Sequence, residues 1–192
     1  METITNKKEI LEVIKNDVWN FRYASEELKD DKEVILEVVK QYGFNLKYAS
    51  ERLRDNEEVV LEAVKNDGFT LQHASERLRD NKEVVFEAVK ENSFALAFAS
   101  ERLRDDREFI LEIVKEEDGL ALKFASERLR DDKELVLEAV KNDGLTLKYA
   151  SERLRNDKEL VLTAIKKSVF AFNLIPKKLK KDEDIKKIIE NY

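Results

Sequence analysis

Arginine pairs recur along the chain at a regular interval, and they are the residues best suited to recognising another molecule. The two arginines of a pair stand two positions apart, and a glutamate precedes the first of them. Guanidinium groups bind phosphates and carboxylates, so a row of them could hold an acidic protein or nucleic acid. The candidate partner-binding residues are Arg52, Arg54, Arg77, Arg79, Arg102, Arg104, Arg128, Arg130, Arg153 and Arg155.

Three interpretations of this arginine stripe stay open. Glu51, Asp55 and their counterparts flank the pairs, which favours a solvated and neutralised face. Binding of an acidic protein is the second interpretation. Binding of nucleic acid is the third and the least favoured, because the chain has a net charge of −6.

Catalysis would need a polar cluster that occurs once, and the sequence offers none. Paired carboxylates can hydrolyse glycosides, but Glu51 and its counterparts recur in each copy. His73 could act as a base, but it stands in a slot that other copies fill with Tyr or Phe, which favours a packing role. The sequence has no phosphate-binding Gly loop, nucleophile elbow or calcium loop, and no Cys with which to build a Cys/His metal site. We therefore expect no enzyme activity, cofactor or metal.

All of these residues belong to one phrase that repeats about every 25 residues. The residues before each Ala-Ser step by 25, 25, 25, 26 and 25 along the series Tyr23, Tyr48, His73, Phe98, Phe124 and Tyr149. A degraded copy follows at Leu174, and the extra residue falls at 116–118, between two copies. The predicted repeats are 5–29, 30–54, 55–79, 80–104, 105–130, 131–155 and 156–180, with a C-terminal capping helix over 182–191.

The first half of each copy predicts a strong amphipathic helix. Asp55 is the expected N-cap, and Glu58 would complete a capping box. Val59, Val60, Leu61, Ala63 and Val64 form its apolar face. The same acidic pair recurs as Asp30/Glu33, Asp80/Glu83, Asp105/Glu108, Asp131/Glu134 and Asn156/Glu159. The helix is expected to stop at a glycine in the left-handed conformation, at Gly43, Gly68, Gly119 and Gly144, with Ser93 in that slot once.

The second half predicts short helical structure with a break at the Ser of Ala-Ser. Pro176 takes the place of that Ser in the last copy, and proline is tolerated only in the first turn of a helix. Trp19, Phe21, Phe170 and Phe172 are expected to fill the core of the terminal copies, with a sticky end that pairs arrays as the alternative. Mild variation at two sets of positions is a weak indication of a recognition surface: 47, 72, 97, 123 and 148, and 45, 70, 95, 121 and 146.

The phrase L-x-Y-A-S-E-x-L-R-x-D-x-E-V-V-L-x-A-V-x-x-(D/N)-G resembles a family of tandem repeats known as domain of unknown function 4116. The matching stretches run from about Phe21 to Ile165, and Phe170–Ile189 is a weaker copy. The resemblance implies a repeat module and carries over no activity, cofactor or catalytic residue. Ser93, His73 and Pro176 depart from the pattern.

An isolated helix of about 11 residues is marginal in water, so the copies must stack on one another. We predict an all-α fold: an α-solenoid of about seven 25-residue two-helix repeats, forming one domain over 1–192. Glu9, Lys186 and Lys187 replace apolar residues of the inner copies, which predicts polar caps at both ends.

The predicted function is a non-catalytic scaffold that mediates protein–protein interaction with an unidentified protein partner. A structural spacer or self-associating array is the alternative, and a binder of acidic or nucleic-acid partners through the arginine stripe is a further one. The sequence has no Cys, no secretory leader and no apolar run of bilayer length, from which we expect a cytoplasmic protein without membrane contact.

Overall fold

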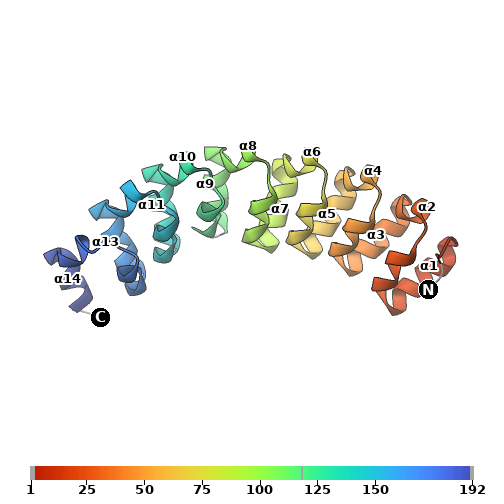
Figure 1. The fold of residues 1–192 in the computed structure, drawn as a ribbon, viewed down its shortest axis with the longest axis horizontal. Coiled ribbons are helices and arrows are strands. Elements are labelled where there is room, and N and C mark those ends of the chain that lie inside the picture. The colour runs from red at the N-terminus through yellow and green to blue at the C-terminus, as the bar shows by residue number, and fades with distance from the viewer. Residues whose placement is uncertain (1–2, 118, 191–192) are drawn as a thin grey trace. The chain divides into compact units, whose positions relative to one another are not determined.

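A ten-residue α-helix followed by two shorter helices is the repeating element of the chain (Figure 1). The computed structural model describes residues 3–117 and 119–190, and within these ranges there is no strand, only an isolated bridge between Ile4 and Ala24. The predicted all-α solenoid of tandem repeats is therefore confirmed. No helix in the described ranges has the length and apolar character that crossing a bilayer requires. The extra residue of the fifth copy falls on Asp118 or its neighbours, and Asp118 lies outside the described residues.

The chain divides into two compact units, residues 1–100 and 101–192, and each is described by itself. The prediction of a single domain over 1–192 stays a prediction. In the first unit the long helices are α1 (Lys7–Asn16), α3 (Lys32–Gln41), α5 (Glu57–Asn66) and α7 (Lys82–Glu91). The 3₁₀ helices are η1 (Val18–Tyr23), η2 (Gly43–Tyr48), η3 (Gly68–His73) and η4 (Ser93–Phe98). The short helices are α2 (Glu26–Lys29), α4 (Glu51–Arg54) and α6 (Glu76–Arg79).

The second unit repeats this order of elements. Its long helices are α9 (Arg107–Glu116), α11 (Lys133–Asn142), α13 (Lys158–Lys167) and the terminal α14 (Glu183–Glu190). The 3₁₀ helices are η5 (Gly119–Lys123), η6 (Gly144–Tyr149), η7 (Val169–Asn173) and η8 (Leu179–Lys181). The short helices are α8 (Glu101–Arg104), α10 (Glu127–Arg130) and α12 (Glu152–Arg155). Helix α14 corresponds to the predicted capping helix over 182–191, whose last residue lies outside the described residues.

The long helices supply the core. In α5 the side chains of Val59, Val60, Ala63 and Val64 are fully or almost fully buried, as predicted, and Leu61 is half-buried. Consecutive long helices pack against each other within each unit, α3 on α5 and α5 on α7 in the first, α9 on α11 and α11 on α13 in the second. A fully buried Val or Leu contributes about 1.5–3 kcal/mol of transfer free energy, so this packing supplies what a single short helix lacks.

The long helices begin one residue later than predicted. Asn56 caps α5, and its side-chain oxygen accepts a hydrogen bond from the Val59 N–H. Asp55 is instead the C-cap of the preceding short helix α4, which ends at Arg54. Glu58 forms no capping box because an apolar residue, Val59, occupies the N3 position. The same correction applies to the predicted caps Asp30, Asp80, Asp105, Asp131 and Asn156, whose following residues are the observed caps.

The glycines that follow the long helices do not adopt the predicted left-handed conformation; no described glycine has a positive φ. They are required by close packing instead. A Cβ built on Gly68 would lie within 3.0 Å of the backbone carbonyl oxygen of Ala88 in the next long helix. The same close approach brings Gly144 to the carbonyl of Ala164. The absence of a side chain at these glycines therefore allows neighbouring repeats to pack closely against each other.

The second half of each repeat is broken at the Ser, as predicted. Ser50 caps the four-residue helix α4, and its hydroxyl accepts a hydrogen bond from the Leu53 N–H. Its φ of −58° lies in the range that a proline ring imposes, which explains why Pro176 can occupy this slot in the last copy.

The variable positions 45, 70, 95, 121 and 146 are not a recognition surface. Asn45, Thr70, Ala95, Ala121 and Thr146 are all fully buried. Each lies in a 3₁₀ helix, on the side that faces the long helices. The interpretation of variation as a surface feature was wrong for these five residues, which share small size. The other variable positions, 47, 72, 97, 123 and 148, are half-buried or exposed, so for them it stays a prediction.

Candidate functional site

The first arginine of each pair is held by the preceding repeat. Arg77 Nε donates a hydrogen bond to Asp55 Oδ1 over 3.0 Å, and Arg77 Nη2 donates to the Asp55 backbone carbonyl over 2.7 Å. The same two contacts join Arg52 to Asp30, Arg128 to Asp105 and Arg153 to Asp131. These four arginines therefore connect neighbouring repeats within a unit.

A serine completes this connection. The Ser75 hydroxyl donates to the Asp55 carboxylate, and the Ser75 N–H donates to the Arg54 carbonyl over 2.9 Å. We call this arrangement, an aspartate that accepts from Ser and Arg of the next repeat, an aspartate clamp. The serine contact recurs at Ser50 to Asp30, Ser100 to Asp80, Ser126 to Asp105 and Ser151 to Asp131.

The clamps keep their aspartates ionised. The hydrogen bond from Ser75 and then that from Arg77 lower the pKa of Asp55. Serine and arginine contacts likewise lower the pKa of Asp30, Asp105 and Asp131. The first arginines thus have an internal role that the sequence did not reveal. The signal that could have revealed it is the constant spacing of Asp, Ser and Arg from one copy to the next.

The second arginine of each pair has a different environment. Its Nε is buried and has no hydrogen-bond partner among the described residues, and this recurs at Arg54, Arg79, Arg104, Arg130 and Arg155. The rest of the guanidinium reaches the surface, since the side chains of Arg54 and Arg130 are each 35% exposed. The Glu one turn earlier lies 4.0 Å from Arg54 and 3.9 Å from Arg130, distances that give a weak ion pair. An external ligand could therefore reach the exposed terminal nitrogens of these arginines, but not the buried Nε.

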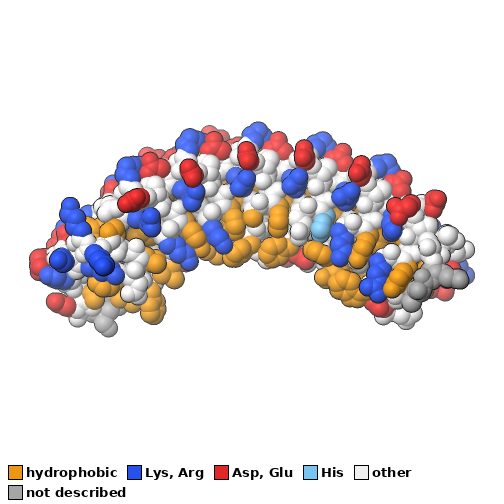
Figure 2. Space-filling model, viewed as in Figure 1, with side chains coloured by type: hydrophobic (Ala, Val, Ile, Leu, Met, Phe, Trp, Pro, Cys, Tyr) orange, Lys and Arg blue, Asp and Glu red, His pale blue; other side chains and the backbone are white. Residues whose placement is uncertain are grey.

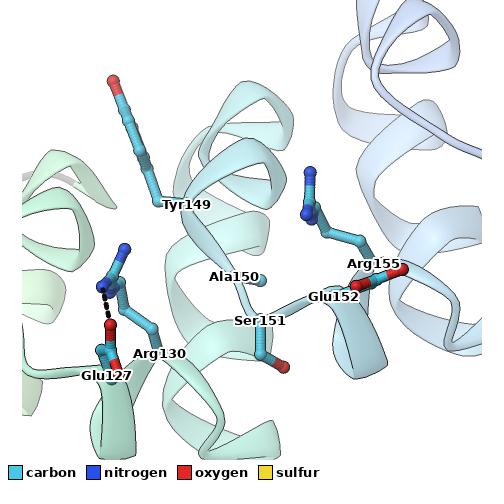
Figure 3. Close-up of a pocket in the computed structure, with 7 residues that line it drawn as sticks. All are labelled: Glu127, Arg130, Tyr149, Ala150, Ser151, Glu152 and Arg155. Carbon is cyan, nitrogen blue, oxygen red and sulfur yellow. Dashed lines mark ion pairs between the residues drawn. The ribbon is translucent and has the colours of Figure 1, made fainter.

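A pocket forms between successive second arginines, and an aromatic ring lines it (Figure 3). Arg130 from α10, Tyr149 from η6 and Arg155 from α12 line it, and their side chains extend to the same side. Glu127 and Glu152 complete its charged rim, and its volume is about 420 Å³. Arg130 is drawn toward Glu127 at the edge of the pocket.

Comparable pockets lie at the neighbouring repeats of the second unit. One is lined by Glu101, Arg102, Arg104, Asp105 and Ser126, and another includes Arg155 and Pro176. Arg102 thus lines the same hollow as the second arginine of its own pair. The pocket is a repeated feature, not one site with convergent unique residues.

Lysines beside the aromatic slot add positive charge to the same surface. Lys148 Nζ lies 4.8 Å from the centre of the Tyr149 ring, and Lys123 Nζ lies 5.0 Å from that of Phe124. In the first unit Lys47 Nζ lies 4.7 Å from the Tyr48 ring. In Figure 2, blue and red side chains alternate along the short helices of each unit, with orange side chains below them. We define the arginine–aromatic face as the surface made by the second arginines, these lysines and the ring that precedes each Ala-Ser.

His73 has the packing role that its slot predicts. Its ring lies edge-on to Phe44, with ring centres 4.8 Å apart. Burial lowers the pKa of His73, and the positive charges of Lys47 and Arg54 lower it further. The imidazole is therefore neutral at pH 7 and belongs to the arginine–aromatic face of the first unit.

The pKa of His73, measured by NMR titration, is expected to lie below the ordinary value of about 6.5. Arg54→Gln is expected to raise it, because one of the positive charges that oppose protonation is removed. Lys65→Gln removes a charge from the exposed end of α5 and serves as the matched control, with no change expected. An unchanged pKa in Arg54→Gln would show that Arg54 does not face His73.

Aromatic side chains that were expected in the core are partly at the surface. Phe21 is fully buried, as predicted, but Trp19 is 44% and Phe170 is 68% exposed, so the core prediction was wrong for both. Phe69 and Phe94, in the same slot, are 37% and 41% exposed. This slot is the second residue of the 3₁₀ helix and faces outward, whereas two positions later Phe21, Leu71 and Leu96 are fully buried. Phe172, also expected in the core, is half-buried.

The described residues contain no group of three or more His, Cys, Asp or Glu side chains that could hold a metal ion. What the arginine–aromatic face offers is ion pairing, hydrogen bonding and ring packing.

A family model described as Domain of unknown function (DUF4116) matches the chain six times in tandem. The matches cover residues 6–54, 56–104, 81–130, 106–155, 132–180 and 157–189. No curated protein and no solved structure matches the chain.

Proposed function

The chain belongs to the repeat family described as Domain of unknown function (DUF4116), and from that premise we propose that it is a non-catalytic scaffold that binds a segment of a partner protein on its arginine–aromatic face. The observation that carries this proposal is the recurring second arginine. Its side chain is 35% exposed at Arg54 and at Arg130, and its ion pair with the glutamate one turn earlier is weak, at 4.0 Å and 3.9 Å.

Repetition of the pocket favours an extended ligand. The hollows around Arg104, Arg130 and Arg155 each contain a second arginine and a glutamate, and the one between Arg130 and Arg155 also contains an aromatic ring. A small substrate needs one site with groups placed for its particular shape. A chain-like ligand can instead use the same contact several times, as repeat proteins commonly do.

The charge pattern favours a protein segment over nucleic acid. Each pocket of the second unit carries an exposed glutamate beside its arginine, and the side chain of Glu127 is 95% exposed. A nucleic acid backbone carries a charge on every phosphate and would meet these carboxylates along its whole length. The net charge of −6 acts in the same direction.

A peptide-display selection on the full chain tests this function. We expect it to enrich peptides that the variant Arg104→Gln/Arg130→Gln/Arg155→Gln no longer binds, because three guanidinium donors are lost. The matched control Lys65→Gln/Lys115→Gln/Lys141→Gln loses the same charge from exposed positions on the long helices and is expected to keep binding. If no peptide is enriched, or if the arginine variant binds as well as the control, the proposal is wrong.

The aspartate clamps favour a second candidate, a structural spacer or self-associating array. They use arginines of the stripe, such as Arg52 and Arg153, to connect repeats within the chain. Light scattering over a concentration series separates the two versions of this candidate. A mass that grows with concentration supports assembly, and a constant mass without any selected peptide supports a spacer.

A further inference from the structure

We infer that the arginine–aromatic face of residues 101–192 binds an acidic peptide in the polyproline II conformation, with a carboxylate at every third residue. The inference rests on the proposed function and specifies the chemistry of the partner. It concerns the second arginines of this unit, Arg104, Arg130 and Arg155.

The spacing of the repeats selects the conformation of the peptide. These arginines end the short helices of successive repeats, whose long helices pack side by side. Packed helices lie about 8–10 Å apart, so consecutive arginines are offered at that interval. A polyproline II helix advances about 3.1 Å per residue with three residues per turn, so every third side chain returns to one face after about 9 Å. In a β-strand, side chains on one face are spaced about 6.6 Å apart, or about 13 Å for every second one. Neither spacing matches the interval of about 8–10 Å between consecutive repeats.

The polar groups of the pocket select the side chain at that position. A carboxylate has two oxygens that can accept from the forked donors of a guanidinium, and such charged hydrogen bonds are stronger than neutral ones. Lys123 and Lys148 lie on the rings next to these arginines and add to the positive charge. The lining of the pocket is balanced, with Arg130 and Arg155 against Glu127 and Glu152. Counting Lys123 and Lys148, which lie on the aromatic rings of the same two repeats, gives a balance of +2.

The aromatic ring that lines the pocket favours particular residues between two carboxylates of the peptide. Tyr149 lines the pocket together with Arg130 and Arg155, and its ring is drawn on the Arg130 side of the pocket (Figure 3). Aromatic rings at such positions pack against proline and other apolar side chains of a polyproline II ligand. Uncharged residues at the two intervening positions also avoid the exposed carboxylates of Glu127 and Glu152.

Two synthetic peptides of identical composition test the inference by fluorescence anisotropy with the full chain. Both contain the same numbers of Glu, Pro and Ala. In the first peptide successive glutamates stand three positions apart; in the second they stand two positions apart, and the remaining Pro and Ala are placed at the ends. We expect the first to bind about tenfold more tightly, the difference that one well-placed charged hydrogen bond provides. Arg130→Gln is expected to weaken its binding about tenfold, and Glu127→Gln is expected to strengthen it, because a repelling carboxylate is removed. Lys141→Gln, a charge change on the exposed end of α11, is expected to have no effect.

The outcomes separate this inference from the proposed function. Equal affinity of the two peptides, no effect of Arg130→Gln, or tighter binding of a single-stranded oligonucleotide would each overturn the inference. If display yields arginine-dependent peptides without the three-residue period, the inference fails and the scaffold function stands. If display yields none, both fail.

Discussion

Gly68→Val is expected to reduce the free energy of unfolding by about 3 kcal/mol, an effect at the upper end for overpacking in a filled interior. The new Cβ would meet the Ala88 carbonyl oxygen and the Asn92 side chain of the next repeat. Because the obstacle is backbone, a rotamer change cannot relieve it, and α5 and α7 would have to separate. Denaturant unfolding followed by circular dichroism measures the change.

Ser93→Ala is the matched control, because Ser93 already carries a Cβ in the slot that glycine fills in other copies. We expect a change well below that of Gly68→Val. Gly68→Ala should fall between the two, since its smaller side chain meets the same carbonyl while alanine restricts the unfolded chain. A Gly68→Val protein as stable as the wild type would contradict the close approach of the two repeats.

Acidification is expected to cause the second large loss of stability, through the aspartate clamps. Serine and arginine contacts lower the pKa of the clamp aspartates in the folded chain. A carboxyl with a lowered folded-state pKa stabilises the fold fully above its unfolded pKa of about 3.9. That stabilisation is lost as the pH falls through the lower folded-state pKa. We therefore expect the melting temperature to fall steeply below about pH 4.

The variant Asp55→Asn/Asp131→Asn tests whether the clamps cause this loss. It is expected to be less stable than the wild type at pH 7, with a melting temperature that depends less on pH, because two of the shifted carboxyls are gone. Ser75→Ala/Ser151→Ala retains both charges and removes the hydrogen bond that lowers the pKa most. The serine variant should also make the melting temperature depend less on pH. If the melting temperature of both variants changes with pH as it does in the wild type, other groups cause the acid sensitivity.

The repeat and its core could be predicted from the sequence because both depend on local patterns. The apolar spacing in α5 fixes which side of the helix is buried, whatever packs against it. The helix start was misplaced by one residue for a non-local reason. Asp55 is of a residue type that commonly caps helices, but its carboxylate instead binds Ser75 and Arg77, which follow some 20 residues later.

The candidate site was found only in outline. The arginine pairs are visible in the sequence, but both members look equally exposed there. Arg77 and Arg79 differ only in what the previous repeat brings to them: Asp55 for the first, and for the buried Nε of the second no partner among the residues that the structure describes. The sequence did not indicate which aromatic side chains are exposed, because Trp19 and Phe21 are both large and aromatic. Only the 3₁₀ helix decides that the Trp19 side chain points to the solvent and the Phe21 side chain to the core.

Because each aspartate clamp uses the same residues, the contacts between neighbouring repeats of the first unit are interchangeable. Excising residues 31–55 would place Asp30 directly before Asn56, where Asp55 stood, facing Ser75 and Arg77 in the geometry that Asp55 has now. Lys7, which pairs with Glu33, would find Glu58 in the corresponding place. A gene encoding such a chain can gain or lose whole copies by unequal recombination, because no new joint has to evolve each time.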